Sequence, residues 1–235
     1  CRMDDNTALK QQPPPHHSAH RDRLRDRFLK GGVDALQDYE ILELILFMAL
    51  PRRDVKPLAK KLIQNFGSFN GVFHASVRDL VSFGLSETTA ISIKTIEAAS
   101  FHLMQQDMIS QPVLNSWAKL LDYVQATMAH EQREHFRLLF LNKKNELIAD
   151  EIQQTGTVDH TPAYPREIMK RALELSSTAI ILVHNHPSGD STPSKPDIDM
   201  TQSIMAAARP LGITIHDHLV VSKKGVTSMK NKGLM

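Results

Sequence analysis

The chain has 235 residues, of which 41% are hydrophobic and 23% are charged; these ordinary fractions exclude a collagen-like, coiled-coil or wholly disordered protein. The formal net charge of +2 by itself argues neither for nor against nucleic-acid binding. The single cysteine, Cys1, excludes a disulfide framework and a multi-cysteine zinc site, so we expect a reducing, cytoplasmic location.

No apolar segment of the chain has the length that crosses a membrane. The longest apolar run, from Ile41 to Leu50, is interrupted by Glu43 and falls far short of the ~20 residues that span a bilayer. Residues 1–30 contain no stretch typical of a secretory signal. We therefore expect no membrane partner.

The first half of the chain has a helical pattern. Residues 1–20 are polar, with consecutive prolines and several histidines, which predicts a disordered tail. Residues 21–106 carry apolar residues at helical spacing, which predicts a small all-α domain. Its segment 38–50 is apolar nearly all round, so we expect this helix at the centre of a bundle, with Asp38 as its cap. The expected helices cover 21–30, 38–50, 55–66, a segment after Ser76 and a segment after Ser86.

The second half of the chain has a mixed pattern. Residues 107–115, which include Pro112, predict a linker to a domain that covers residues 116–235. In that domain β-branched runs interleave with helical patterns, which predicts an α/β (α+β) fold. The run 178–183 has the composition of a buried strand. The other expected strands are 135–141, 147–152 and 213–222, and helices are expected to begin near Ser116, Pro165 and Ile198.

Two histidines directly follow the expected buried strand. Because alternate residues of an extended chain face the same side, His184 and His186 can present two imidazoles to one point. Asp197 opens the next helix, where it can turn its carboxylate back towards them. Two histidines and a carboxylate with an open fourth position are typical of a catalytic zinc site. The sequence therefore predicts Zn²⁺ at His184, His186 and Asp197.

A second pair of histidines lies in the expected strand 213–222. His216 and His218 are expected to share a face, with Asp217 between them facing away. No carboxylate stands at a spacing that matches Asp197. We interpret this pair as structural, or as a partner of the metal ligands.

The spacing His184-x-His186-x7-Ser194-x2-Asp197 resembles the JAMM signature of the MPN+ metalloproteases and isopeptidases. The wider context is similar to the bacterial RadC family, and the resemblance covers about residues 20–235. It implies an MPN/JAMM-type domain preceded by a small helix-hairpin-helix-like domain. The segments that carry this resemblance are His20–Leu24, Phe28–Gly32, Tyr164–Glu167 and Ala179–Asp190.

The resemblance also implies catalytic roles. The family uses an upstream glutamate as general base on a zinc-bound water, and Glu134, just before the expected strand 135–141, is the best match. Glu151, a strand-end charge, and Glu167, in a first helical turn, are the alternatives. Ser194 would help to hold the oxyanion of the tetrahedral intermediate, although a helix N-cap explains the same residue. The implied substrate is a peptide or isopeptide bond.

RadC-like proteins carry a helix-hairpin-helix region, in which backbone N–H groups of a tight hairpin meet a phosphate. Here the hairpin would contain Gly84, with Ser86 in place of the usual second glycine. A basic cluster could add phosphate contacts, although a solvated helical face explains it equally well. DNA is thus the partner that the resemblance implies for residues 21–106. The cluster consists of Arg52, Arg53, Lys56, Lys60 and Lys61.

Three functions compete at this point. The sequence favours a RadC-like zinc-dependent hydrolase, because the ligands and a candidate base are all present. The alternative is a DNA-binding accessory protein whose MPN domain is a scaffold, and such a domain is expected to have lost some of those residues. A nuclease would need phosphate-directed groups near the site, for which Arg166 and Lys195 are the candidates.

Overall fold

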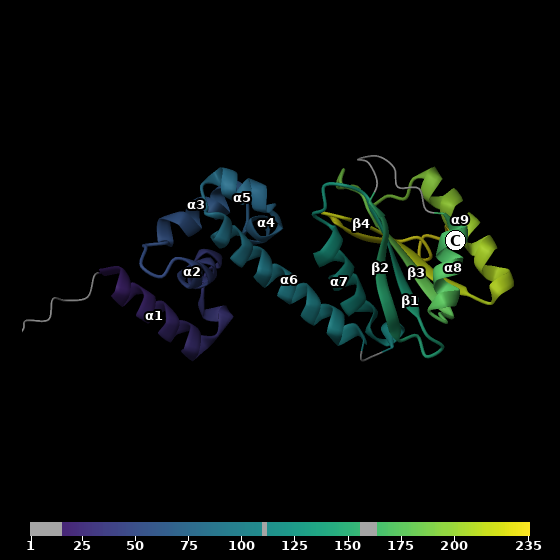
Figure 1. Ribbon diagram of the computed structural model, residues 1–235, viewed down its shortest axis with the longest axis horizontal. Helices are drawn as coiled ribbons and strands as arrows, with labels where there is room; N and C mark the ends of the chain where they lie inside the picture. The colour runs from purple at the N-terminus through teal and green to yellow at the C-terminus, as the bar shows by residue number, and fades with distance from the viewer. Residues whose placement is uncertain (1–15, 110–111, 156–163) are drawn as a thin grey trace, which may run out of the picture. The chain divides into compact units, whose positions relative to one another are not determined.

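A computed structural model gives the fold of the chain (Figure 1) and describes residues 16–109, 112–155 and 164–235. The chain divides into two compact units, Cys1–Glu97 and Ala98–Met235, which we treat separately. The first unit is helical and the second is built around a five-stranded sheet. The expected fold class, a small all-α region followed by an α/β domain, is confirmed.

The helical unit is organised around α2 (Asp38–Ala49), which contacts α1 (His16–Gly31), α3 (Lys56–Phe66) and α4 (Phe69–His74). The expected central place of this apolar helix is therefore confirmed. Two more helices follow, α5 (Val77–Phe83) and α6 (Glu87–Ile109), and α6 continues into the second unit. No helix in the described part of the chain combines the length and the apolarity needed to cross a membrane. The core of this unit includes Leu24, Leu42, Leu46, Leu62, Val72, Leu80, Ala90 and Ile93.

Two segments differ from the expected domain boundaries. Residues 16–20, expected in the disordered tail, belong to α1. Of these, His20 is held by Glu43, since its Nε2 lies 2.8 Å from a carboxylate oxygen of that buried residue. Residues 1–15 of that tail lie outside the described residues. At the other end, α6 extends to Ile109 and so overlaps the expected linker 107–115, of which residues 110–111 are not described.

The expected cap of α2 is wrong by one residue. The helix begins at Asp38 itself, and its N-cap is Gln37. The backbone N–H of Gln37 donates a 3.0 Å hydrogen bond to the Glu40 carboxylate, which satisfies a donor at the helix start. Aspartate is a favoured N-cap residue and glutamine is not, so the sequence pointed to Asp38, whereas the contact with Glu40 places Gln37 there.

Arg21 is a buried cation that joins α1 to the end of α2. Its Nη2 donates to the carbonyl oxygens of Leu50 (2.6 Å) and Arg53 (2.7 Å), and its guanidinium lies 4.3 Å from the centroid of the Phe47 ring. The carbonyl of Leu50 at the end of α2 and that of Arg53 in the following connection lie outside regular helix, and Arg21 supplies a donor to both. Burial lowers the pKa of Arg21, and the charge of Arg25 acts in the same direction.

The second unit contains one sheet with the strand order β2-β1-β3-β4-β5. β1 (His135–Leu141) pairs antiparallel with β2 (Leu147–Thr155) and with β3 (Ala179–Asn185), β3 pairs parallel with β4 (Thr214–Ser222), and β4 pairs antiparallel with β5 (Gly225–Ser228). The four expected strands are confirmed. The short edge strand β5 was not expected from the sequence.

Helices cover both faces of this sheet (Figure 1). α7 (Trp117–Met128) packs on one face, and α8 (Pro165–Glu174) and α9 (Lys195–Ala208) pack on the other. Because side chains alternate along a strand, β1 and β3 contribute to both cores. Every residue of β3 is buried, so this strand lies in the middle of the unit. β3 gives Ile181 and Val183 to the α7 side and Ile180 and Leu182 to the other side.

We expect Arg21→Met to lower the free energy of unfolding of the helical unit by about 2–3 kcal/mol, because the carbonyls of Leu50 and Arg53 after α2 lose a charged donor. Urea unfolding followed by far-ultraviolet circular dichroism measures this change. Arg23→Met, on the exposed side of the same helix, is the matched control and is expected to shift stability by less than ~0.5 kcal/mol. Equal unfolding midpoints for the two variants would contradict the role assigned to Arg21.

Candidate metal centre

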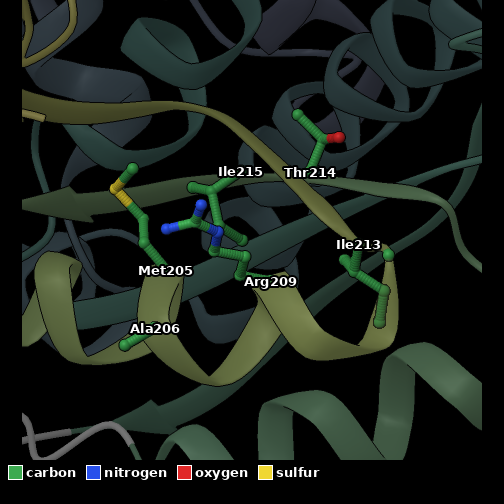
Figure 2. A pocket seen from close by; sticks show the side chains of 7 residues that line it. Met205, Ala206, Arg209, Ile213, Thr214 and Ile215 are labelled. Atoms are coloured by element: carbon green, nitrogen blue, oxygen red, sulfur yellow. The ribbon is translucent and has the colours of Figure 1, made fainter.

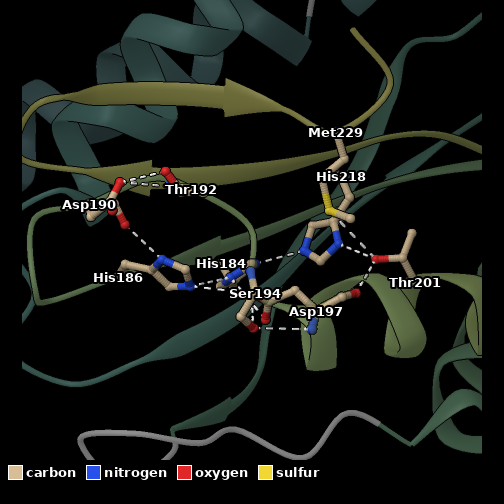
Figure 3. Close-up of polar contacts among 9 residues, drawn as sticks. All are labelled: His184, His186, Asp190, Thr192, Ser194, Asp197, Thr201, His218 and Met229. Atoms are coloured by element: carbon tan, nitrogen blue, oxygen red, sulfur yellow. Dashed lines mark hydrogen bonds and ion pairs between the residues drawn. The ribbon is translucent and has the colours of Figure 1, made fainter. Parts of the chain in front are cut away.

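Two histidines stand at the carboxyl end of the central strand. His184 lies in β3 opposite Phe136 of β1 and Val220 of β4, and it is 5% exposed. His186 follows the strand, and its backbone N–H donates to the Val221 carbonyl at 2.8 Å. The two Nε2 atoms lie 2.9 Å apart (Figure 3). The sheet therefore holds both imidazoles against one point, as the spacing predicts.

Asp197 reaches the histidines from the first turn of α9. Ser194 is the N-cap of this helix, and its backbone N–H (2.7 Å) and hydroxyl (2.6 Å) donate to Oδ2 of Asp197. The Asp197 N–H donates back to the Ser194 hydroxyl at 3.3 Å. This reciprocal capping box turns the carboxylate towards the end of β3. Oδ1 lies 3.3 Å from His184 Nε2, and Oδ2 lies 3.5 Å from His186 Nε2.

The donor atoms of His184, His186 and Asp197 all lie within 4.8 Å of one another. Zinc bonds of about 2.0–2.1 Å in tetrahedral geometry place ligand atoms about 3.3 Å apart. The closest separations here are 2.9, 3.3 and 3.5 Å. Two imidazole nitrogens and one carboxylate therefore fit a Zn²⁺ ion and leave a fourth position for another ligand.

The second nitrogen of His186 is committed to the loop that follows β3. Nδ1 lies 2.8 Å from the carbonyl oxygen of Asp190, and because a carbonyl only accepts, Nδ1 carries the hydrogen of the neutral ring. Nε2 then keeps the lone pair that a metal requires. Gly189 makes the turn with a φ of +85°, which favours glycine, and Thr192 donates from its N–H (3.0 Å) and hydroxyl (2.8 Å) to the Asp190 carboxylate.

The charges of these groups reinforce one another. Hydrogen bonding with Asp197 raises the pKa of His186, and the negative charge of Glu134 acts in the same direction. Burial raises the pKa of Asp197, but hydrogen bonds from His184 and His186, which form when Nε2 of the ring is protonated, outweigh it and hold that pKa well below its usual value. A proton and a metal ion therefore compete for His186 Nε2, since the same carboxylates attract both.

Glu134 is the candidate base, and it lies on the chain just before the strand that pairs with β3. It directly precedes β1 and is half-buried. Phe136 pairs with His184 at the end of the antiparallel ladder. Glu134 precedes Phe136 by two residues and His186 follows His184 by two, so an extension of the same register sets Glu134 opposite His186 and on the same face. The negative charge of Glu134 also raises the pKa of His186, so Glu134 lies near that candidate ligand.

Asn185 holds the segment that carries Glu134. Its side chain is completely buried, accepts from the His135 N–H at Oδ1 (2.8 Å) and donates from Nδ2 to the Arg133 carbonyl (3.0 Å). These two contacts fasten the residues on either side of Glu134. The sequence reasoning did not assign Asn185 a role, although an amide between two candidate ligands in an apolar strand is a signal that could have identified it.

The alternative bases lie elsewhere in the same unit. Glu151 is on β2, opposite Leu138, and its carboxylate accepts a 2.6 Å hydrogen bond from Arg171. Glu167, in the first turn of α8, pairs with Arg166 at 3.0 Å. Both carboxylates thus form ion pairs with arginines. The charge of Glu134 instead acts on His186, which favours Glu134 among the three candidate bases. Arg166 and Lys195, the candidates for a nuclease, are exposed.

The second histidine pair does not share one face, so that expectation is wrong. A β-bulge in β4 leaves His216 without a partner in β3, because Ile180 pairs with Ile215 and Ile181 pairs with Asp217. His218 Nε2 lies 2.8 Å from His184 Nδ1, on the α9 side of the sheet. Burial lowers the pKa of His218 well below its usual value.

His216 turns instead towards α7. It lines a pocket together with Trp117 and Asp217, so Asp217 does not face away from it as expected. Its Nε2 lies 2.7 Å from Oδ1 of Asn145, and burial lowers its pKa, with the charge of Lys230 acting in the same direction. His216 is therefore structural, while His218 contacts a candidate ligand.

The predicted DNA-binding hairpin connects α5 to α6. Gly84 ends α5 with a φ of +114°, a conformation that favours glycine. Ser86 accepts a 3.2 Å hydrogen bond from the Thr89 N–H at the start of α6. A capping role therefore accounts for the serine in the second glycine position, and DNA contact here stays a prediction.

The predicted basic cluster lies at the α2–α3 connection. Lys56 and Lys60 lie over the ring of Tyr39, 5.6 Å and 4.8 Å from its centroid. This cation–π contact accounts for two members of the cluster without DNA. The exposed members are Arg52, Arg53, Lys60 and Lys61.

An open pocket lies at the other end of α9 (Figure 2). Arg209 is the only charged residue among its described lining residues, which include no histidine, carboxylate or thiol. These residues therefore supply neither metal ligands nor a general base. The lining comprises Met205, Ala206, Arg209, Gly212, Ile213, Thr214 and Ile215.

Two family models match the chain. Residues 114–234, just over half of the chain, match the model described as RadC-like JAB domain, which covers the sheet and the candidate metal centre. Residues 16–91 match the model described as UPF0758 N-terminal, which covers α1 to α5 and the start of α6. The resemblance inferred from the sequence is confirmed. The chain belongs to the RadC family, and its JAB domain has a metallohydrolase-type fold.

Proposed function

We propose that this member of the RadC family is a zinc-dependent hydrolase of peptide or isopeptide bonds. The observation that carries the proposal is the convergence of His184, His186 and Asp197, with closest donor-atom separations of 2.9–3.5 Å. Glu134 stands beside them as a candidate base. A scaffold would not require two imidazole nitrogens and a carboxylate to converge in this way.

In this proposal three residues would bind the metal ion and a fourth would transfer the proton. His184 Nε2, His186 Nε2 and the Asp197 carboxylate would hold the ion. A bound zinc ion supplies a Lewis acid that makes water more acidic and polarises a carbonyl group. The Glu134 carboxylate would accept a proton from the attacking water and return it to the leaving amine.

Ser194 has two compatible roles in this proposal. Its hydroxyl donates to the Asp197 carboxylate at 2.6 Å and so orients a ligand. A hydroxyl hydrogen can rotate about its C–O bond, and we propose that it turns towards the oxyanion that develops on the substrate. The capping contact through the Ser194 backbone N–H at 2.7 Å does not depend on that rotation.

We expect Glu134→Gln to lower the rate of hydrolysis by about 10²- to 10⁴-fold and to leave zinc content unchanged, because the amide cannot accept the proton. A panel of peptide and isopeptide substrates, with metal analysis of each preparation, measures both quantities. Glu131→Gln is the matched control, since this exposed neighbour lies 3.6 Å from the His135 ring and outside the ligand group. Full activity of Glu134→Gln would rule out Glu134 as the base.

We expect Asn185→Ala to lower kcat by at least about 10-fold while one zinc ion per chain is retained, because Glu134 loses the contacts that fix its neighbours. Asn185→Asp keeps an acceptor for the His135 N–H but loses the donor to Arg133, and we expect an intermediate effect. Steady-state kinetics and metal analysis provide the test. A loss of zinc with unchanged activity per bound ion would contradict this role.

We expect zinc affinity to rise with pH and to level off above the raised pKa of His186, which lies above the ordinary value of 6.5. Below that pKa, one proton must leave Nε2, so affinity falls by up to about tenfold per pH unit. Calorimetry in buffers of different ionisation enthalpy measures the released proton. His216→Gln, outside the ligand group, is expected to behave as wild type.

A wild-type chain that takes up no zinc would contradict the proposal and favour the DNA-binding scaffold.

A further inference from the structure

His218 is not one of the proposed ligands, yet it occupies the space behind His184. It lies on β4, its side chain is completely buried, and its ring stands edge-on to Phe136 with a centroid separation of 5.7 Å. Its Nε2 lies 2.8 Å from His184 Nδ1, and its Nδ1 lies 2.6 Å from the hydroxyl of Thr201 on α9 (Figure 3). These contacts form a series of hydrogen bonds from Thr201 on α9 through His218 to the candidate metal ligand His184.

Thr201 determines which group donates and which accepts in each of these hydrogen bonds. Its hydroxyl oxygen lies 2.6 Å from the carbonyl oxygen of Asp197. Two oxygens at that distance repel one another unless a hydrogen lies between them, and a carbonyl has none to give. Thr201 therefore donates its only hydroxyl hydrogen to Asp197 O. The other neighbour of the hydroxyl, the Met229 sulfur at 3.7 Å, is also only an acceptor.

The remaining hydrogens follow from this assignment. Since the Thr201 hydrogen is used, its oxygen accepts from His218, and His218 carries its hydrogen on Nδ1. Complete burial favours the neutral ring, so His218 Nε2 has a lone pair and accepts. His184 must then donate from Nδ1, so its neutral ring has a lone pair on Nε2 that is directed at His186 and Asp197. In metal-free protein the 2.9 Å between the two Nε2 atoms requires a hydrogen, which His186 Nε2 carries and a metal ion would replace.

We infer that Thr201 and His218 are positioning residues that hold His184 in the tautomer able to bind a metal through Nε2. This inference rests on the proposed function, because it assigns a task in the same metal centre. The opposite tautomer would place a hydrogen on Nε2 and block coordination. Residues outside the ligand group thus fix the state of a ligand.

The position of His184 explains why a side chain, and not a backbone carbonyl, accepts the hydrogen of its Nδ1. His184 lies within β3, with Phe136 of β1 and Val220 of β4 opposite it, so the backbone around it is committed to the sheet. His186 lies beyond the strand, where the carbonyl of Asp190 is available to its Nδ1. Both candidate ligands therefore carry a hydrogen on Nδ1, but His184 donates it to a histidine side chain and His186 donates it to a backbone carbonyl.

The test compares Thr201→Val with Thr201→Ser in the full chain. Valine has the shape of threonine without the hydroxyl, so His218 loses the acceptor for Nδ1–H, while serine retains it. Ser203→Ala is the matched control, because Ser203 makes the same type of bond to the carbonyl four residues earlier (2.9 Å) on the exposed side of α9.

The first measurement uses metal-free protein. Heteronuclear NMR of isotope-labelled histidine side chains is expected to show His184 with its hydrogen on Nδ1 in the wild type and in Thr201→Ser. In Thr201→Val we expect a shift of hydrogen towards Nε2 of His184. An unchanged tautomer in Thr201→Val would overturn the inference.

The second measurement is the zinc dissociation constant, determined by competition with a chelator. We expect an increase of about 10- to 100-fold in Thr201→Val and a change of less than about threefold in Thr201→Ser and Ser203→Ala. Equal affinities in all variants would overturn the inference. If the wild type binds no zinc, the proposed function fails, whereas the tautomer measurement still decides the assignment of the His184 hydrogen.

A second pair of variants covers the case in which Thr201→Val does not fold. The amide of His218→Gln can donate to Thr201 and accept from His184, whereas His218→Leu can do neither. We expect His218→Gln to keep the Nδ1–H tautomer of His184 and to bind zinc at least about tenfold more tightly than His218→Leu. Equal zinc affinity and the same His184 tautomer in both variants would overturn the inference.

Discussion

The candidate site depends on the confinement of β3, which is buried on both faces and paired with β1 and β4 on both edges. Residues at the end of such a strand cannot move without breaking backbone hydrogen bonds that have no water to replace them. The backbone of His184 and His186 is held in place by these hydrogen bonds. Asp197 joins them through the connection from β3 to α9, where the capping box with Ser194 orients its carboxylate.

The same confinement explains why the contacts behind the ligands are side chains of particular types. His184 lies inside the ladder and meets His218, whereas His186 lies beyond it and meets a backbone carbonyl. Asn185 stands between them and uses both ends of its amide to hold the residues around Glu134. Three consecutive residues thus carry two ligands and the support of the candidate base, which makes this strand end sensitive to substitution.

Buried charge is also decisive in the helical unit. The apolar helix α2 contains Glu43, which is fully buried and meets His20, and its end is closed by the guanidinium of Arg21. A buried charge without a partner is costly, so both contacts tie α1 to α2. These contacts give α1 a structural reason to begin before residue 21, within the segment that the sequence suggested was a tail.

The sequence alone determined the family, most of the strands and the three candidate ligands, because these depend on spacings of a few residues along one segment. It left the choice among Glu134, Glu151 and Glu167 open, gave no role to Asn185, and placed His216 and His218 on one face. Those questions depend on which strand lies beside which, and on the register between them. Only the tertiary structure bears on them: Glu151 and Glu167 pair with arginines while the charge of Glu134 acts on His186, and one bulge in β4 separates His216 from His218. A bulge of a single residue changes the face of every side chain before it relative to those after it, and local sequence carries no reliable sign of that.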